Sequence, residues 1–379
     1  VSAEEIHHDK SKKIINYKNA WLKIYDKPIL YFPKFFHPDP TVKRQSGFLM
    51  PTLSSSNNLG NYLSVPYFYA ISDNKDLTFT PRFYDKQKTL YQAEYRQANK
   101  SSDHVMDFGI LNKSRLIETN KTLGTHFFVK SNFDTDINYF ENSSIDLNIQ
   151  QVSQDNYLKT NKIKSPIITN ETVLNSKIEF EGNTKDLDLN LYTEVYEDLS
   201  KETSDRYEFI FPSYSLTKYI ESSLEGELSF TSSGNNKLYD TNIYEKTMTN
   251  DLNFQSFKNI IGNGFVTNYE LLLKNSNSDS KNSKTSKNKL DQNLQSIIKY
   301  QIQYPLKKKG VKFDQVLTPI LSARFSPNKS KDIKGSDRII DYNNIFSLNR
   351  IGSTETVEGG QSITIGNEFK RIDKLGNEI

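Results

Sequence analysis

Cysteine is missing from all 379 residues, so disulfide bonds cannot stabilise this chain and thiol chemistry is excluded. Charge of one sign is not in excess either, because 49 basic and 46 acidic side chains leave a formal net charge of +3. Such a balance supplies no broad basic field, and we expect no nucleic-acid partner. No run of 18 apolar residues occurs, so the sequence predicts no transmembrane helix.

Recognised catalytic and cofactor motifs are also lacking. The sequence contains no phosphate-binding loop, no G-x-S-x-G elbow and no G-x-G-x-x-G turn. His7 and His8 could ligate a metal ion, but no further ligands follow them at a useful spacing. We therefore expect no catalytic residues, no metal site and no cofactor, and we do not expect an enzyme.

Aromatic residues are abundant, with 22 Tyr and 23 Phe against an apolar fraction of only 35%. Aromatic and β-branched side chains favour sheet over helix. In residues 186–198, Leu187, Leu189 and Leu191 alternate with polar residues, and residues 144–150 repeat this period of two. From about residue 52 onward, roughly fifteen such runs predict an all-β protein.

Two all-β architectures fit this pattern. A soluble sandwich or propeller would bury the apolar faces internally, whereas a transmembrane barrel turns them to lipid and keeps a polar lumen. Many runs reach the length of a tilted bilayer crossing, and their second faces carry Asp, Glu, Asn, Gln and Lys. Tyr and Phe gather at run ends such as 67–69 and 83–84, as interfacial girdles require. The pattern favours the barrel over the soluble alternative.

Two regions depart from the long alternating runs. Residues 1–36 contain short strands at 20–24 and 29–32, broken at 26–28, and we interpret them as the end of a separate, water-exposed β-domain. Residues 275–289 form a Lys, Asn and Ser tract of low complexity, which predicts a mobile loop.

The stretch at residues 27–51, KPILYFPKFFHPDPTVKRQSGFLMP, joins the N-terminal region to the first long runs. It resembles the junction between jelly roll and barrel in the lipopolysaccharide-assembly outer-membrane protein family LptD, also called Imp or OstA. The resemblance continues through residues 62–96, which include Pro66, Asp76 and Arg96, and returns in NIFSLNRIGSTETVEGG at 344–360. Well-studied members of the family pair their two domains through disulfides, which this cysteine-free chain cannot form.

The resemblance implies a division of the chain into three regions. Residues 1-36 would be the C-terminal remnant of a periplasmic OstA-like jelly roll, residues 37-51 a proline-rich linker, and residues 52-379 the N-terminal part of an outer-membrane β-barrel. The expected fold class is all-β: an antiparallel transmembrane β-barrel, incomplete at about 15 strands, preceded by the end of a β jelly roll. Relative to the family, both ends of the chain look cut.

The function that the resemblance implies is transport of lipopolysaccharide and its insertion into the outer leaflet of the outer membrane. The chain would lie in the outer membrane of a Gram-negative bacterium, with its N-terminal segment in the periplasm. Its partners would be lipopolysaccharide, outer-membrane lipid, an LptE-like plug lipoprotein and an LptA-like periplasmic bridge protein. A general porin or receptor-type barrel is the alternative, and it predicts ion conductance without lipopolysaccharide defects.

Two prolines are candidate elements of a lateral gate or hinge. Proline has no N–H and therefore removes ladder hydrogen bonds. Pro51 stands at the start of the barrel and Pro66 within its first strand, and both match prolines of the family. We hypothesise that they weaken the pairing of the first strand with the last. The alternative is that Pro51 only ends the linker and Pro66 marks a bulge.

The remaining candidates belong to the lipid path or the junction, and they are Tyr31, Phe32, Phe35, Phe36, Lys43, Arg44 and Gly47. The four aromatic residues could line the path of the acyl chains, or several of them could form the core of the small domain. The two cations could bind lipid phosphates or lie at the bilayer boundary, where cations are common. Gly47, together with Ser46, would permit the turn into the first strand.

Overall fold

A computed structural model describes residues 2–24, 26–42, 44–56, 60–85, 89–112, 123–202, 205–284, 288–329, 340–351, 356–373 and 378. The chain divides into two compact units. Unit 1 comprises Val1–Ser131 and Ile149–Glu171, and unit 2 comprises Asn132–Asn148 and Thr172–Ile379.

Unit 1 begins with a three-stranded antiparallel sheet of β1 (Glu5–Asp9), β2 (Ile14–Ile24) and β3 (Lys27–Pro38). The shorter strands predicted at 20–24 and 29–32 are wrong in extent. Within the described residues β3 pairs with β2 alone, and an edge strand tolerates proline because it needs ladder N–H groups on one side only. Pro28 and Pro33 therefore lie inside β3 without ending it.

The rest of unit 1 is an antiparallel meander with one short helix. The helix, α1 (Tyr157–Asn161), lies in the connection that follows β12. No helix in the described part of the chain is long and apolar enough to cross a membrane. The strands of the meander are β4 (Gly47–Phe48), β5 (Thr52–Ser56), β6 (Gly60–Ser64), β7 (Tyr67–Ser72), β8 (Lys75–Tyr84), β9 (Leu90–Ala98), β10 (Ser102–Asn112) and β11 (Leu123–Thr135).

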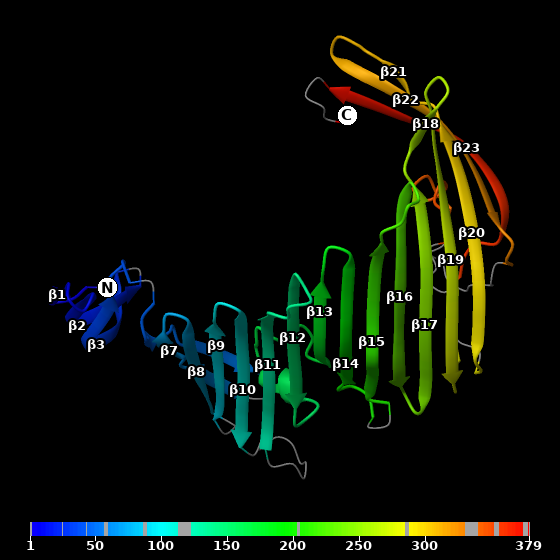
Figure 1. Ribbon diagram of the computed structural model, residues 1–379. Coiled ribbons are helices and arrows are strands. Elements are labelled where there is room, and N and C mark those ends of the chain that lie inside the picture. Colours follow the sequence, from blue (N-terminus) through cyan, green and yellow to red (C-terminus); the bar gives the residue numbers. More distant parts are fainter. Residues whose placement is uncertain are drawn as a thin grey trace. The chain divides into compact units, whose positions relative to one another are not determined.

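Unit 2 consists mainly of longer strands that pair antiparallel along the sheet, and β13 to β17, β19 and β20 lie side by side in Figure 1. Two strands cross the boundary: β11 begins in unit 1 and ends in unit 2, and β12 begins in unit 2 and ends in unit 1. The strands are β12 (Asn142–Val152), β13 (Val173–Asn183), β14 (Leu187–Asp198), β15 (Tyr207–Ile220), β16 (Gly226–Tyr239), β17 (Ile243–Ser256), β18 (Asn259–Ile261), β19 (Phe265–Lys281), β20 (Asp291–Gln303), β21 (Leu306–Lys308), β22 (Phe313–Ser326) and β23 (Gly360–Asp373).

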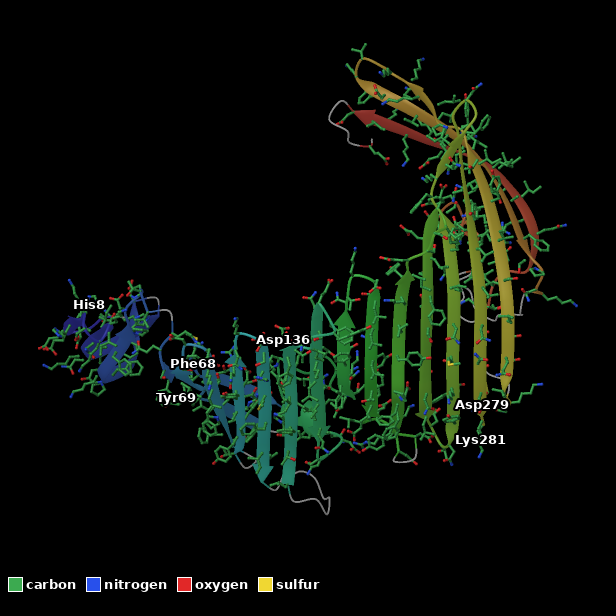
Figure 2. The ribbon with its side chains drawn as sticks, in the orientation of Figure 1. His8, Phe68, Tyr69, Asp136, Asp279 and Lys281 are labelled. Carbon is green, nitrogen blue, oxygen red and sulfur yellow. The ribbon has the colours of Figure 1, made fainter. Side chains whose placement is uncertain are left out.

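The polar tract predicted as a mobile loop begins as a strand. β19 runs through Asp279 to Lys281, which Figure 2 shows at one end of that strand, and Lys281 pairs with Tyr244 of β17. Side-chain amides support this extension: Asn250 Nδ2 donates to Asn275 Oδ1 at 3.2 Å. The loop prediction is therefore wrong for residues 275–281, because ladder pairing with β17 and β20 replaces the missing apolar alternation.

The two faces of these strands are inverted relative to those of a water-soluble sheet. On β19, Leu271 and Leu273 are exposed, whereas Lys274 on the opposite face retains only 4% exposure. Lys274 Nζ donates to the Asp251 carboxylate at 2.6 Å, so the buried charge is paired. We call the face with exposed apolar side chains the lipid face and the other the polar face, because a membrane barrel turns apolar residues outward.

The strand order from β4 to β23 is that of an antiparallel barrel sheet, which confirms the predicted all-β barrel class. From residue 52 onward the described residues form β5 to β23, more than the roughly fifteen strands predicted, because short strands such as β18 and β21 accompany the long ones. The division at 1-36, 37-51 and 52-379, with its jelly-roll remnant, stays a prediction.

Candidate functional site: the junction and the first strands

Aromatic side chains cluster on the three-stranded sheet. The rings of Trp21 and Tyr31 lie 4.9 Å apart, and those of Phe32 and Phe35 lie 5.5 Å apart. Phe32 and Phe35 are half-buried, whereas Tyr31 and Phe36 are exposed. The pair at 32 and 35 therefore packs within the small sheet, while Tyr31 and Phe36 present aromatic surface to their surroundings.

An ordered turn follows β3. Asp39 accepts hydrogen bonds from the Thr41 backbone N–H at 2.9 Å and from the Thr41 hydroxyl at 2.7 Å, and its other carboxylate oxygen lies 2.5 Å from His8 Nε2. These bonds, the Thr41 backbone bond first, hold the pKa of the Asp39 carboxyl below its ordinary value. The start of the linker is thereby tied to β1, on which Figure 2 labels His8.

Arg44 is bound to the first turn of the meander. Its guanidinium forms an ion pair with Asp76 and donates to the Asp73 carbonyl at 2.6 Å. Arg96 Nε donates to the same Asp76 carboxylate at 2.8 Å, and the Asp76 side chain is only 5% exposed. Two guanidinium groups thus share one buried carboxylate, which clamps the linker to β8 and β9. The other predicted cation, Lys43, lies outside the described residues.

The partners of Arg44 were not among the predicted site residues, although the sequence held a signal for them. Asp76 and Arg96 both fall within the block at 62–96 that resembles the LptD family.

Gly47 pairs with Phe68 inside β4, and a side chain at Gly47 would meet no atom within 4 Å. Ser46 Oγ accepts a hydrogen bond from the Ala70 backbone N–H at 2.9 Å.

Three prolines lie at the same height in three neighbouring strand segments, β4–β5, β6–β7 and β8, and we call them the proline row. Pro51 separates β4 from β5, Pro66 separates β6 from β7, and Pro81 lies within β8. The Leu49 N–H donates to the Pro66 carbonyl at 2.9 Å, and the Val65 N–H donates to the Pro81 carbonyl at 3.2 Å. The break between β4 and β5 therefore faces the break between β6 and β7, which in turn faces Pro81 in the unbroken β8.

The missing N–H groups face these same ladders. In an antiparallel pair, the N–H and C=O of one residue point to the same neighbouring strand. Pro66 therefore lacks a donor toward Leu49, and Pro81 lacks one toward Val65. The side that carries Pro51 also has a bulge. Phe48 pairs with Tyr67 and Thr52 pairs with Ser64, so three residues on the Pro51 side face two residues on the Pro66 side. The ladders on the two sides of β6 and β7 thus each lack one donor.

Sequence reasoning singled out Pro51 and Pro66 but not Pro81. The repeated interval of fifteen residues between the three prolines is a signal that could have identified the third. The interval alone does not show that the prolines lie in neighbouring strands. The pairing of β6 and β7 with β8 is what brings Val65 opposite Pro81.

The inverted faces and the antiparallel strand order define the class of outer-membrane β-barrel proteins. A family model described as LptD, LPS transport system D, matches residues 124–378, and the chain belongs to this family. The matched residues include nearly all of β11 to β23, whereas Pro51, Pro66 and Pro81 come before them in the chain.

Curated relatives carry the same family name. The chain is 31% identical over 158 residues to the LPS-assembly protein LptD of Pseudoalteromonas translucida, and 30% identical over 170 residues to that of Legionella pneumophila strain Paris. Each match covers 42% of this chain and 20% of the relative, so the matched region spans about a fifth of the relatives' length. A match to LptD of Pseudomonas aeruginosa strain UCBPP-PA14 is 35% identical over 94 residues, 25% of this chain and 10% of the relative.

Among solved structures, a bacterial polysaccharide outer membrane secretin aligns with 82% of this chain and 89% of its own, at 9% identity and a TM-score of 0.26. A likeness at this level carries no argument about function.

Proposed function

We propose that this protein transports lipopolysaccharide and inserts it into the outer leaflet of the outer membrane. Membership of the LptD family supports the substrate, since the relatives are named LPS-assembly proteins. The observation that carries the mechanism is the row of Pro51, Pro66 and Pro81, in which Pro66 and Pro81 lack donors toward Leu49 and Val65 of the adjacent ladders. No catalytic step forms part of the proposal.

The proline row would serve as part of a lateral gate. An amphiphile that moves between a polar lumen and lipid must separate a pair of strands, and the cost of separation falls when ladder bonds are already missing. On the lipid face beside the row, Leu53, Leu63 and Phe83 are exposed and could receive acyl chains. The polar face would carry the sugars. The exposed Tyr31 and Phe36 would guide the lipid moiety toward the gate.

The lengths of the connections support a periplasmic N-terminal segment. In an antiparallel meander, successive connections lie at opposite ends of the strands. The connections 73–74, 99–101 and 184–186 lie at one end and are short. The connections 153–172 and 327–359 lie at the other end and are long. Outer-membrane barrels have short periplasmic turns and longer extracellular loops. The linker enters β4 at the short-turn end, so the small sheet would lie in the periplasm.

The proposed partners follow from the surfaces that they would meet. Within the described residues, β1 and β3 each pair with β2 alone, so an LptA-like bridge protein could add a strand to an edge of the small sheet. An LptE-like plug lipoprotein would contact the polar face of the barrel, and outer-membrane lipid would contact the other face. The clamp between Arg44 and Asp76 would fix the direction in which the small sheet delivers lipid.

Depletion of the protein in its own cell tests the function. We expect lipopolysaccharide at the cell surface to fall while the total amount made is unchanged. A cell that keeps normal surface lipopolysaccharide but loses an ion conductance would contradict the proposal and identify a porin instead. Purification adds an independent check, because the exposed lipid face requires detergent.

A further inference from the structure

A row of basic and amide side chains crosses three neighbouring strands of unit 2. Lys308 of β21 pairs with Gln315 of β22, and Gln315 pairs on its other side with Arg371 of β23. Because directly paired residues of antiparallel strands point to the same face, the three side chains lie together on one face of the sheet. We call them the basic row. The connection 304–312, which contains β21, lies at the same end of the strands as the short turn 184–186 (Figure 1).

The basic row continues the lipid face. Leu306, Leu317 and Phe369 pair across the same three strands, and all three are exposed. Each lies two residues from a member of the basic row, and side chains two residues apart in a strand point to the same face. The two rows touch, because the guanidinium carbon of Arg371 lies 5.9 Å from the centre of the Phe369 ring. The apolar surface thus ends in cationic groups, as it does where the headgroups of a bilayer begin.

Two neighbouring basic residues on the polar face of the same strands are neutralised by carboxylates. Lys307 Nζ lies 3.1 Å from Asp314 Oδ2. Lys370 Nζ lies 3.0 Å from Glu368 Oε1 and 2.9 Å from Glu378 Oε1. Both of these positive charges therefore have a partner within the protein, and neither needs an outside anion.

The cations of the basic row lack such partners. Within the described residues neither Lys308 nor Arg371 forms an ion pair, and both side chains are exposed. Gln315 between them adds an amide that can donate to an anion without carrying a charge. The next acidic residue along this face, Asp373, lies one row farther from the apolar surface and is not ion-paired with Arg371. The row therefore presents two unneutralised cations beside exposed apolar side chains.

We propose that the basic row binds the phosphate of a glycerophospholipid in the periplasmic leaflet, whose acyl chains lie against Leu306, Leu317 and Phe369. Neighbouring strands are about 4.8 Å apart, so the backbones of Lys308 and Arg371 are about 10 Å apart and both side chains can reach one phosphodiester. A guanidinium donates parallel N–H groups to phosphate oxygens, and an ammonium adds a compact charge. The choice of leaflet rests on the proposed orientation of the barrel, whereas the binding of lipid does not depend on lipopolysaccharide transport.

The two rows together decide the class of ligand. A free phosphate or an acidic peptide would use the charges and leave the apolar row in water, whereas an anionic lipid covers both rows at once. Each Lys or Arg near an anionic lipid surface strengthens binding by about fivefold. Two such cations in one row favour a lipid that carries a negative charge over a neutral one.

Retention of defined lipids by the full-length protein in detergent tests the proposal. The protein is titrated with phosphatidylglycerol, and the fraction that keeps one lipid is measured by native mass spectrometry. The variant K308Q/R371Q should bind about thirtyfold more weakly, which is the product of two fivefold losses. The variant K307Q/K370Q removes the same charge from the same two strands on the polar face and should bind normally. The variant K308R/R371K keeps both charges and should retain most of the binding.

Competing ligands separate the possible sources of the anion. Diacylglycerol with the same acyl chains lacks the phosphate and should not be retained, and excess inorganic phosphate should not displace the lipid. Equal losses in K308Q/R371Q and K307Q/K370Q, or no loss in the first, would overturn the site. Tighter binding of lipid A than of phosphatidylglycerol would assign the row to the transported lipid and contradict the proposal. These results leave the proposed function untouched, because that function stands or falls with surface lipopolysaccharide after depletion.

The position of the row relative to the bilayer provides a second test. Because the chain has no cysteine, Gln315→Cys supplies a single attachment site for a fluorophore within the basic row. In vesicles of phosphatidylethanolamine and phosphatidylglycerol that carry a headgroup quencher, this fluorophore should be strongly quenched. Val316→Cys, the next residue in β22 and on the polar face, is the matched control and should be quenched far less. Equal quenching at the two positions, or none at Gln315, would place the row away from the headgroups and refute the proposal.

Discussion

Pro66→Ala should slow the delivery of lipopolysaccharide to the cell surface. The substitution restores an N–H at a position whose carbonyl already accepts from Leu49, so one further ladder hydrogen bond can form across the first two strand paths. One intramolecular hydrogen bond contributes about 0.5–1.5 kcal/mol net. If the strands must separate for each lipid, the open fraction should fall about twofold to about twelvefold.

The assay is the rate at which pulse-labelled lipopolysaccharide becomes accessible at the surface of cells that depend on the variant. Pro81→Ala restores a donor toward Val65 on the other ladder, so the double variant should show the product of the two factors. Pro319→Ala is the matched control, because Pro319 also lies in a strand, β22, and its carbonyl accepts from the Tyr304 N–H at 3.1 Å. An unchanged rate in the double variant, or an equal slowing in the Pro319 control, would refute the reasoning.

Three further predictions concern the clamp, the connection before β23 and the lipid face. Arg44→Met removes one of the two cations on a buried carboxylate, and it should lower the midpoint of thermal unfolding in detergent while Lys at the same position restores some of the loss. Burial would raise the pKa of Glu358, but Arg350 and Arg324 outweigh it and hold the pKa below its ordinary value of 4.5. The contribution of Glu358 to stability is therefore complete above pH 4.5 and is lost as pH falls through the lowered pKa, so protease cleavage between 340 and 359 should increase only in acid; cleavage that is independent of pH would argue against it. Leu273→Arg on the lipid face should destabilise the folded barrel by up to about 2–4 kcal/mol in denaturant unfolding from lipid vesicles, whereas Asn277→Arg beyond the apolar band should be tolerated, and similar losses for both would contradict the assignment of faces.

Local pattern was sufficient for the fold class. In residues 186–198 the period-two alternation is continuous, and it predicts the strand that β14 forms. The two faces also followed from composition, because a face of Asp, Asn and Glu cannot be buried among apolar residues. The tract at 275–281 could not be predicted in this way, since its strand conformation depends on pairing with β17, which is a property of the tertiary fold.

The candidate site, too, could be predicted from the sequence only in part. Pro51 and Pro66 were identifiable because proline alters hydrogen bonding wherever it stands. Pro81 required the register of β8, and Asp76 required the knowledge that Arg44 reaches it. The basic row was invisible in the sequence, because its members come from three strands that approach one another only in the folded chain.

Photo-crosslinking with pulse-labelled lipopolysaccharide tests the central claim, which is that lipid leaves the protein beside the proline row. Leu63 of β6 and Ile178 of β13 are both exposed on the lipid face, but only Leu63 lies beside the row. With a photoreactive amino acid at either position, newly made lipopolysaccharide should be captured at Leu63 before it is captured at Ile178. Identical time courses at the two positions would contradict a gate in the first strands.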